Sequence, residues 1–106
     1  MNTIIARLTM QDGKEEEALA HLRKMGDAVQ ANEPGALAYA IHRSLENPSE
    51  IVFVEVYTDD AALQSHGQTA HMGEFRAAFA EIFDAPKTKI ERLERIGGFV
   101  RPEAGG

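Results

Sequence analysis

The chain has 106 residues, of which 43% are hydrophobic and 26% charged, and it contains no cysteine. This composition is typical of one soluble globular domain covering residues 1–106, and it excludes disulfides, thiolate metal sites and cysteine nucleophiles. The net charge of −6 argues against a nucleic-acid partner, because phosphate binding needs clustered Lys and Arg side chains. No apolar run approaches a membrane span and no signal peptide is evident, so we expect a cytoplasmic protein without a membrane partner.

Two strands and one helix are predicted in the first half of the chain. Residues 3–10 alternate between two faces, as a strand does. Residues 14–31 carry apolar side chains at helical spacing, and we expect Asp12 to cap this helix. A proline and a glycine end the helix, and residues 36–45 are predicted to form a second strand that is rather apolar on both faces.

The second half is predicted to hold a third strand, a split helix and a last strand. Residues 51–57 are β-branched and aromatic, so they pair with the preceding strand in a hairpin. We expect helices over 61–66 and 70–83, then a strand over 88–100 bent at two glycines, and a frayed tail over 101–106. The order β-α-β-β-α-β predicts an α+β, ferredoxin-like fold with a four-stranded antiparallel sheet.

Such a sheet has helices on one face only. Three valines alternate with Phe53, Glu55 and Tyr57 along the third strand, so neither side of this strand is polar enough for water. A second copy of the chain is the simplest cover, and we therefore expect a homodimer.

Glu55 stands mid-strand between two aromatic residues, where a carboxylate is costly to bury without a partner. We therefore expect Glu55 to be structural, ionised and paired with an arginine. The candidate partners are Arg7, Arg43 and Arg92.

The candidate chemistry is concentrated in residues 55–79. His66 and His71 are not spaced i, i+4, and no third ligand follows at a characteristic spacing, so a metal site is disfavoured. His71 flanks the apolar stripe of the longer helix, where it either carries a proton or buttresses the helix junction. Phe75 and Phe79 belong to that stripe, which is more typical of core than of a ligand pocket, although an internal pocket would satisfy both interpretations.

A series of short motifs covers nearly the whole chain. They are Glu33-Pro34-Gly35 before Leu37 and Tyr39, Glu55-Val56-Tyr57, Ala62-Leu63, His66, and Ala70-His71-Met72 with Phe75. In these motifs the sequence resembles the antibiotic biosynthesis monooxygenase family of dimeric α+β barrels. The segment from His66 to Met72 is most similar to the quinol monooxygenase branch.

The resemblance implies oxidation of a quinol or polycyclic phenolic compound by O2 without flavin, haem or metal. The substrate is deprotonated and its anion passes an electron to O2 in a dry pocket, which needs a base, a donor and apolar walls. The implied catalytic residues are His71, Tyr57 and His66. The implied substrate-binding residues are Phe53, Phe75, Phe79, Tyr39 and Met72.

The sequence departs from the family pattern in two places. It has no tryptophan, so Tyr57 is the aromatic residue that follows the acid. Arg7 and Thr9 occupy the region where the haem-degrading members have an asparagine, so haem degradation is disfavoured. Because the same fold hosts members without known activity, the alternative function is a non-catalytic small-molecule-binding or stress-response barrel.

Overall fold

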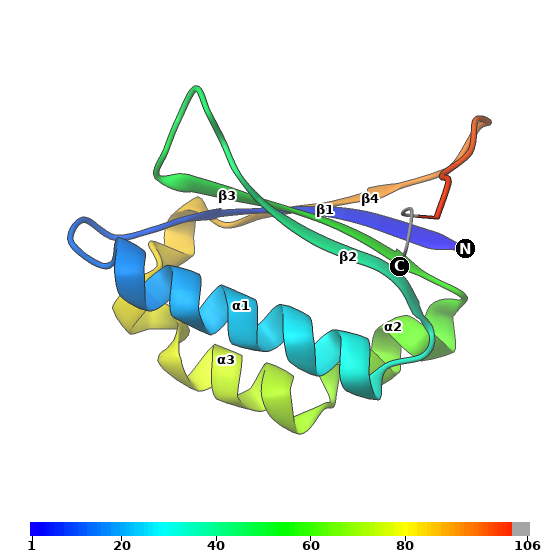
Figure 1. Cartoon of the computed structure of the whole chain (residues 1–106), viewed down its shortest axis with the longest axis horizontal. Helices are drawn as coiled ribbons and strands as arrows, with labels where there is room; N and C mark the ends of the chain where they lie inside the picture. Colours follow the sequence, from blue (N-terminus) through cyan, green and yellow to red (C-terminus); the bar gives the residue numbers. More distant parts are fainter. Residues whose placement is uncertain (103–106) are drawn as a thin grey trace.

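A computed structural model describes residues 1–102 as one antiparallel sheet with helices packed on one of its faces (Figure 1). The elements are β1 (Asn2–Thr9), α1 (Glu15–Asn32), β2 (Ala36–Arg43), β3 (Glu50–Tyr57), α2 (Asp60–Gly67), α3 (Ala70–Ile82), a 3₁₀ turn (Ala85–Lys87) and β4 (Lys89–Leu93). The sheet order is β2-β3-β1-β4, and all three neighbouring pairs are antiparallel. The predicted ferredoxin-like α+β fold is confirmed.

The core lies between the sheet and the helices. Apolar side chains at every second position of β1 and β3 face inward, because strand side chains alternate between the two faces of a sheet. The helix α1 contributes a stripe at helical spacing that packs on them. The buried members from these three elements are Ile4, Ala6, Leu8, Ala18, Leu22, Met25, Val29, Ile51, Phe53 and Tyr57.

The start of α1 differs from the prediction. Lys14 occupies the cap position without a side-chain hydrogen bond, and Asp12 is exposed. Gly13, with a φ of 79°, separates Asp12 from the helix, and the Lys14 N–H donates to the carbonyl of Gln11. This turn places Asp12 too early in the chain to act as the cap. Three glutamates in the first turn still complement the positive end of the helix.

The last strand is shorter than the predicted residues 88–100. Its pairing with β1 ends at Leu93 opposite Thr3, since β1 begins only one residue earlier. Beyond Leu93 the chain has no neighbouring strand to pair with, and Ile96, Phe99 and Val100 are exposed. Of the predicted frayed tail, Arg101 and Pro102 are exposed and have no regular structure, while residues 103–106 lie outside the described residues.

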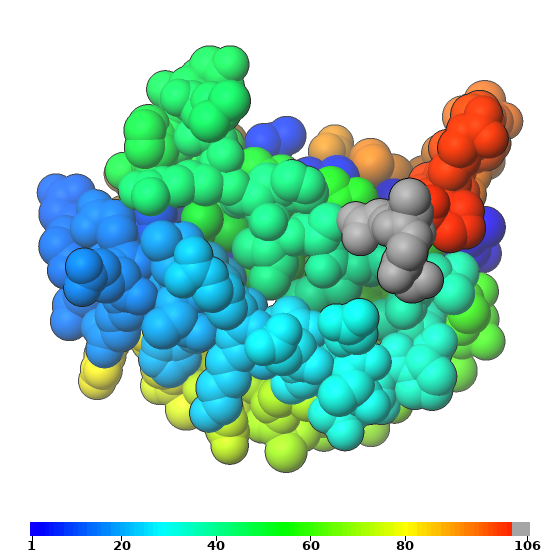
Figure 2. All heavy atoms as spheres, viewed as in Figure 1, coloured from blue at the N-terminus to red at the C-terminus, as the bar shows by residue number. Residues whose placement is uncertain are grey.

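Two segments project beyond the sheet on the side away from α1 and α3 (Figures 1 and 2). One is the loop between β2 and β3, where Leu45 is 92% exposed. The other is the segment that follows β4. Between them lies the uncovered face of the sheet, which carries Ile5, Val52 and Val54 as half-buried side chains. Within residues 1–102, none of the helices has the length and hydropathy of a membrane span.

Candidate functional site

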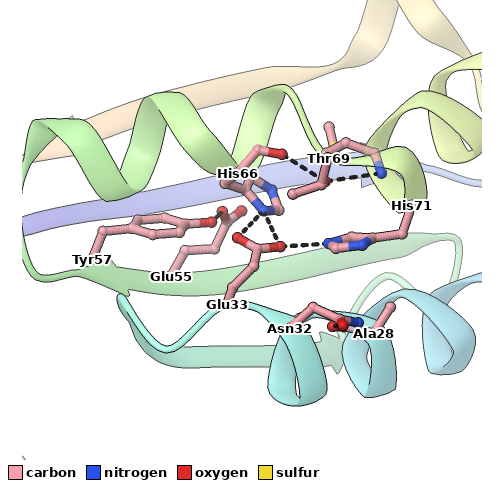
Figure 3. Close-up of polar contacts among 9 residues, drawn as sticks. Ala28, Asn32, Glu33, Glu55, Tyr57, His66, Thr69 and His71 are labelled. Atoms are coloured by element: carbon pink, nitrogen blue, oxygen red, sulfur yellow. Dashed lines mark hydrogen bonds and ion pairs between the residues drawn. The ribbon is translucent and has the colours of Figure 1, made fainter.

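Polar side chains from four elements meet at one end of the interior (Figure 3). Glu55 and Tyr57 point inward from β3, and Glu33 stands at the C-terminal cap of α1. His66 belongs to the last turn of α2 and His71 to the first turn of α3. We call these five residues the polar cluster.

The junction between α2 and α3 is fixed by Thr69. Its hydroxyl donates to the carbonyl of His66 at 2.8 Å and accepts from the backbone N–H of Met72 at 3.2 Å. One side chain therefore ends α2 and caps α3. The helix α2 is capped by a side chain as well, because the Asp59 carboxylate accepts from the N–H of Ala62 at 2.8 Å. These caps hold both histidines over the end of α1.

Glu33 joins the two histidines. Its carboxylate oxygens lie 2.9 and 3.0 Å from Nδ1 of His66 and one of them lies 2.5 Å from Nε2 of His71. The side chains of Glu33 and His66 are each 8% exposed, and that of His71 is 15% exposed. Since an ionised carboxylate only accepts, both imidazoles donate to it, which leaves Nε2 of His66 and Nδ1 of His71 as the acceptor atoms.

Glu55 pairs with Tyr57, whose hydroxyl donates to the Glu55 carboxylate at 2.6 Å. The predicted arginine partner is wrong. Arg7 pairs with Glu50, Arg43 donates to the carbonyl of Pro48, and Arg92 contacts Asn2 and Asp60. Glu55 points toward the helices, whereas Arg7 lies on the uncovered face of the sheet, opposite Val52. Strand alternation therefore keeps Arg7 out of reach of Glu55.

Burial controls the ionisation of the groups around Glu55. Desolvation raises the pKa of Glu55, and the charge of Glu33 raises it further, while the Tyr57 hydroxyl and His66 act in the opposite direction. Desolvation also raises the pKa of Tyr39 and of Tyr57, and the nearby carboxylates add to it. Both phenols therefore stay protonated; the Tyr57 hydroxyl donates to Glu55, and the Tyr39 hydroxyl is able to donate to a ligand.

The predicted aromatic residues fall into two groups. Tyr39 and Tyr57 lie beside His66, with ring centroids 5.5 and 5.4 Å from it. Phe53 lies against Tyr39 with a centroid distance of 5.5 Å. These contacts bring aromatic faces to the polar cluster.

The other predicted wall residues lie further along α3. Phe75 and Phe79 pack on each other at 5.8 Å and on Phe83 at 5.8 and 5.0 Å, as part of the core. Met72 is half-buried in the first turn of α3. Phe75 and His71 also line a small surface cavity of about 70 Å³ between α1 and α3. The structure thus brings His66, His71, Tyr57 and Tyr39 together. Phe75 and Phe79 pack mainly against the core.

A larger cavity, of about 430 Å³, lies at the opposite end of the sheet. It is lined by residues such as Thr9, Gln11, Asn47 and Asp84, and by none of the predicted site residues. Because its lining is polar and remote from the histidines, we assign the candidate site to the polar cluster.

Sequence reasoning did not assign Glu33 a role. It is 33 residues from His66 and 38 from His71, so no local spacing links the three. The only local signal is its position directly before the proline and glycine that end α1. Glu33 is also a third potential metal ligand beside His66 and His71, which the spacing of the two histidines in the sequence did not reveal.

The sequence profile of the antibiotic biosynthesis monooxygenase family matches residues 1–78. The chain belongs to this family. It is 28% identical over 86 residues to YcnE of Bacillus subtilis strain 168, a provisionally named monooxygenase, with 81% of this chain and 90% of YcnE covered. Relatives of known structure should therefore have the same fold as this chain.

Two crystal structures bear this out. PA3566 from Pseudomonas aeruginosa superposes with a TM-score of 0.81 at 29% identity, covering 91% of this chain and 94% of that one. A protein from Caulobacter crescentus CB15, described as belonging to the antibiotic biosynthesis monooxygenases, superposes with a TM-score of 0.83 at 29% identity, covering 91% and 90%. Fold and family therefore agree, and neither identifies a substrate.

Proposed function

We propose that this protein is a monooxygenase of the quinol branch of its family, oxidising a quinol or polycyclic phenolic compound with O2 without flavin, haem or metal. The observation that supports it most is the environment of His66. This residue is 6% exposed, Glu33 holds its Nδ1, and its Nε2 makes no hydrogen bond with residues 1–102. A buried imidazole with one nitrogen anchored and the other available is suited to accept a substrate proton.

Glu33 acts as a positioning residue in this proposal. By accepting from Nδ1 of His66 it fixes the tautomer in which Nε2 is the acceptor, and its negative charge stabilises the imidazolium that forms. His71 is the second candidate base, since Glu33 fixes its ring in the same way through Nε2. The same carboxylate therefore prepares both histidines for proton transfer.

Tyr39 supplies the donor. Its raised pKa keeps the hydroxyl protonated, so it can donate to negative charge on a substrate oxygen, whereas the one hydrogen of the Tyr57 hydroxyl is already donated to Glu55. Deprotonation makes the aromatic substrate electron-rich, and the anion passes electrons to O2. At an anthrone-type ring carbon, one C=O replaces two C–H bonds and the second oxygen atom leaves as water, so the substrate supplies every electron.

Oxygen consumption tests this function. Purified protein would be supplied with a panel of quinols and dihydroxyanthrones, and the initial rates compared for wild type, His66→Ala and His71→Ala. Loss of the base should lower the rate by roughly 10²–10⁴-fold while the fold is kept. His42→Ala is the matched control, because His42 lies opposite Val52 on the face of the sheet away from the polar cluster, and its ring bonds only the carbonyl of Val52.

Two results would contradict the proposal. If both variants keep the parental rate, neither histidine is the base. If the wild type binds the aromatic compounds but consumes no oxygen, the non-catalytic binding barrel is the better description.

We also propose that the protein is a homodimer joined through the uncovered face of the sheet. Its support is the combination of apolar side chains on that face, such as Val54, with exposed Leu45 and Phe99 on the two projecting segments. Sedimentation equilibrium at micromolar concentration should report a dimer for the wild type. The Val54→Lys variant should sediment as a monomer, and a wild type that is monomeric would contradict the proposal.

A further inference from the structure

We infer that Glu33, His66 and His71 form a binding site for one divalent transition-metal cation. Two imidazole nitrogens and one carboxylate converge from α1, α2 and α3, and their ligand atoms all lie within 4.8 Å of one another. Imidazole and carboxylate are the ligands that zinc, cobalt and related ions take in proteins, and two histidines with one glutamate is a known zinc set with an open fourth position.

The distances are close to those that an ion requires. Metal–ligand bonds of about 2.0–2.2 Å place neighbouring ligand atoms of a tetrahedral site about 3.4 Å apart. The His66 Nδ1 is 2.9 Å from one oxygen of Glu33, and the His71 Nε2 is 2.5 Å from the other. An ion therefore has to widen both contacts by less than about 1 Å, which rotations of the glutamate and imidazole side chains can supply.

The charge around the three residues favours a cation. Within residues 1–102, Glu33 has no Lys or Arg partner and forms ion pairs with the two histidines only. Glu55 faces the same region, because its carboxylate accepts from Tyr57, whose ring centroid lies 5.4 Å from that of His66. Buried carboxyl groups without a Lys or Arg partner are stabilised when a metal ion neutralises them.

The structure also offers an access route. His71 is the most exposed of the three side chains and lines the small surface cavity between α1 and α3. Lys24 and Glu74 line the same cavity, and their charged groups pair with each other at 3.6 Å. The mouth of the route therefore does not present an uncompensated positive charge to an incoming ion.

Metal binding has a consequence for the proposed base. An ion on Nδ1 of His66 and Nε2 of His71 takes the two atoms that now donate to Glu33, so each ring carries its proton on the other nitrogen. His66 then presents an N–H at Nε2 instead of an acceptor. Metal binding and base catalysis by His66 exclude each other. The site itself does not rest on the proposed function.

Calorimetric titration tests the site directly. Untagged, chelator-treated protein would be titrated with Zn²⁺, and with Co²⁺ while its visible absorption is followed. We expect one ion per chain, and at least a tenfold to hundredfold loss of affinity in Glu33→Gln and in His71→Ala, since changes in the outer shell alone have effects of that size. His42→Ala and Glu46→Gln remove the same residue types from exposed positions and should bind as the wild type does.

A second measurement needs no variant of the site. In NMR spectra of the wild type, one equivalent of Zn²⁺ should shift the imidazole signals of His66 and His71 and leave that of His42 unchanged. No binding, an unchanged affinity in Glu33→Gln, or shifts at His21 or His42 without shifts at His66 and His71 would overturn the inference.

Activity separates this inference from the proposed function. Zn²⁺ should suppress oxygen consumption by the wild type at the concentration where the calorimetric site fills, and activation by the ion would overturn the exclusion argued above. A wild type that consumes no oxygen but binds one Zn²⁺ through Glu33 would remove the proposed function and leave the metal site standing.

Discussion

The two ends of the interior lie under the same layer of helices, but one is apolar and the other is polar. At one end, Phe75, Phe79 and Phe83 pack ring against ring with centroids 5.0–5.8 Å apart. At the other, Glu33 and His66 are held by hydrogen bonds. The helix α3 runs from one end to the other, with His71 in its first turn and Phe79 in its third.

The difference in polarity indicates that the apolar end stabilises the fold and that the polar end serves a function. Apolar burial stabilises a fold with no requirement for orientation, and removing an aromatic side chain from it leaves a cavity. Buried polar groups gain little net stability, and they are expensive whenever one partner is missing. A small domain that buries two carboxyl groups and a histidine beside one another is therefore expected to use them. Variants that break one contact at a time in each end measure this difference.

The largest effect is expected at the apolar end. Phe83 is 1% exposed and contacts both Phe75 and Phe79, so Phe83→Ala should lower the free energy of unfolding by about 3–5 kcal/mol. Urea unfolding followed by circular dichroism measures the loss. Arg76→Ala is the control, because Arg76 is exposed on α3 and its removal should leave stability nearly unchanged. A loss below 1 kcal/mol for Phe83→Ala would mean that the aromatic end is loosely packed.

A smaller effect is expected where a single hydroxyl serves the polar cluster. Tyr57→Phe removes the donor to Glu55 and leaves a buried carboxyl group without it, which should lower the free energy of unfolding by about 1–3 kcal/mol. Tyr39→Phe is the matched control, since its hydroxyl makes no hydrogen bond with residues 1–102. Equal losses in the two variants would show that the Tyr57–Glu55 contact does not stabilise the fold.

The cap between α2 and α3 should contribute less again. Thr69→Ala removes both hydrogen bonds of the junction and should lower the free energy of unfolding by about 1 kcal/mol. Because the cap positions His66 and His71, the rate of oxygen consumption should fall as well. Thr58→Ala, at an exposed position before α2, is the control for both measurements. A rate that is unchanged in Thr69→Ala would separate the junction from the function.

The two ends also differ in how far the sequence predicted them. The alternation in residues 51–57 and the helical stripe containing Phe75 and Phe79 follow from local periodicity, and the structure bears both out. The final strand was predicted too long because its length depends on where β1 begins, which is information from the other end of the chain.

The contacts of the polar cluster could not be predicted from local sequence patterns. Glu33 was not assigned a role and Glu55 was assigned the wrong partner, because the choice of a hydrogen-bond partner depends on which face each element buries. Tyr57 lies two residues from Glu55 on the same face of β3, so the correct partner was visible in the alternation itself. The link from Glu33 to His66 and His71 depends on how three helices pack together, and one sequence carries no signature of it.

The smallest effect is a pH dependence at Glu55. Burial raises the pKa of this carboxyl group in the folded chain above its ordinary value of 4.5, Glu33 adds to the rise, and Tyr57 and His66 oppose it. Below 4.5 the carboxyl is protonated in both the folded and the unfolded chain, and it contributes no pH dependence. As the pH rises toward the folded value, the unfolded chain loses its proton first, so the stability of the wild type falls.

Glu55→Gln removes that titration and keeps an oxygen that accepts from Tyr57. The variant should therefore match the wild type in acid and become the more stable of the two as the pH rises through the interval between the unfolded and the folded pKa of Glu55. Urea unfolding at a series of pH values measures the difference between the two proteins, which are identical at every other residue. Glu46→Gln, in the exposed loop, should show no such divergence. If the free energy of unfolding of the wild type instead rose relative to that of Glu55→Gln as the pH rose, the fold would stabilise Glu55 as an anion. Hydrogen bonds to the carboxylate would then outweigh the cost of burying it.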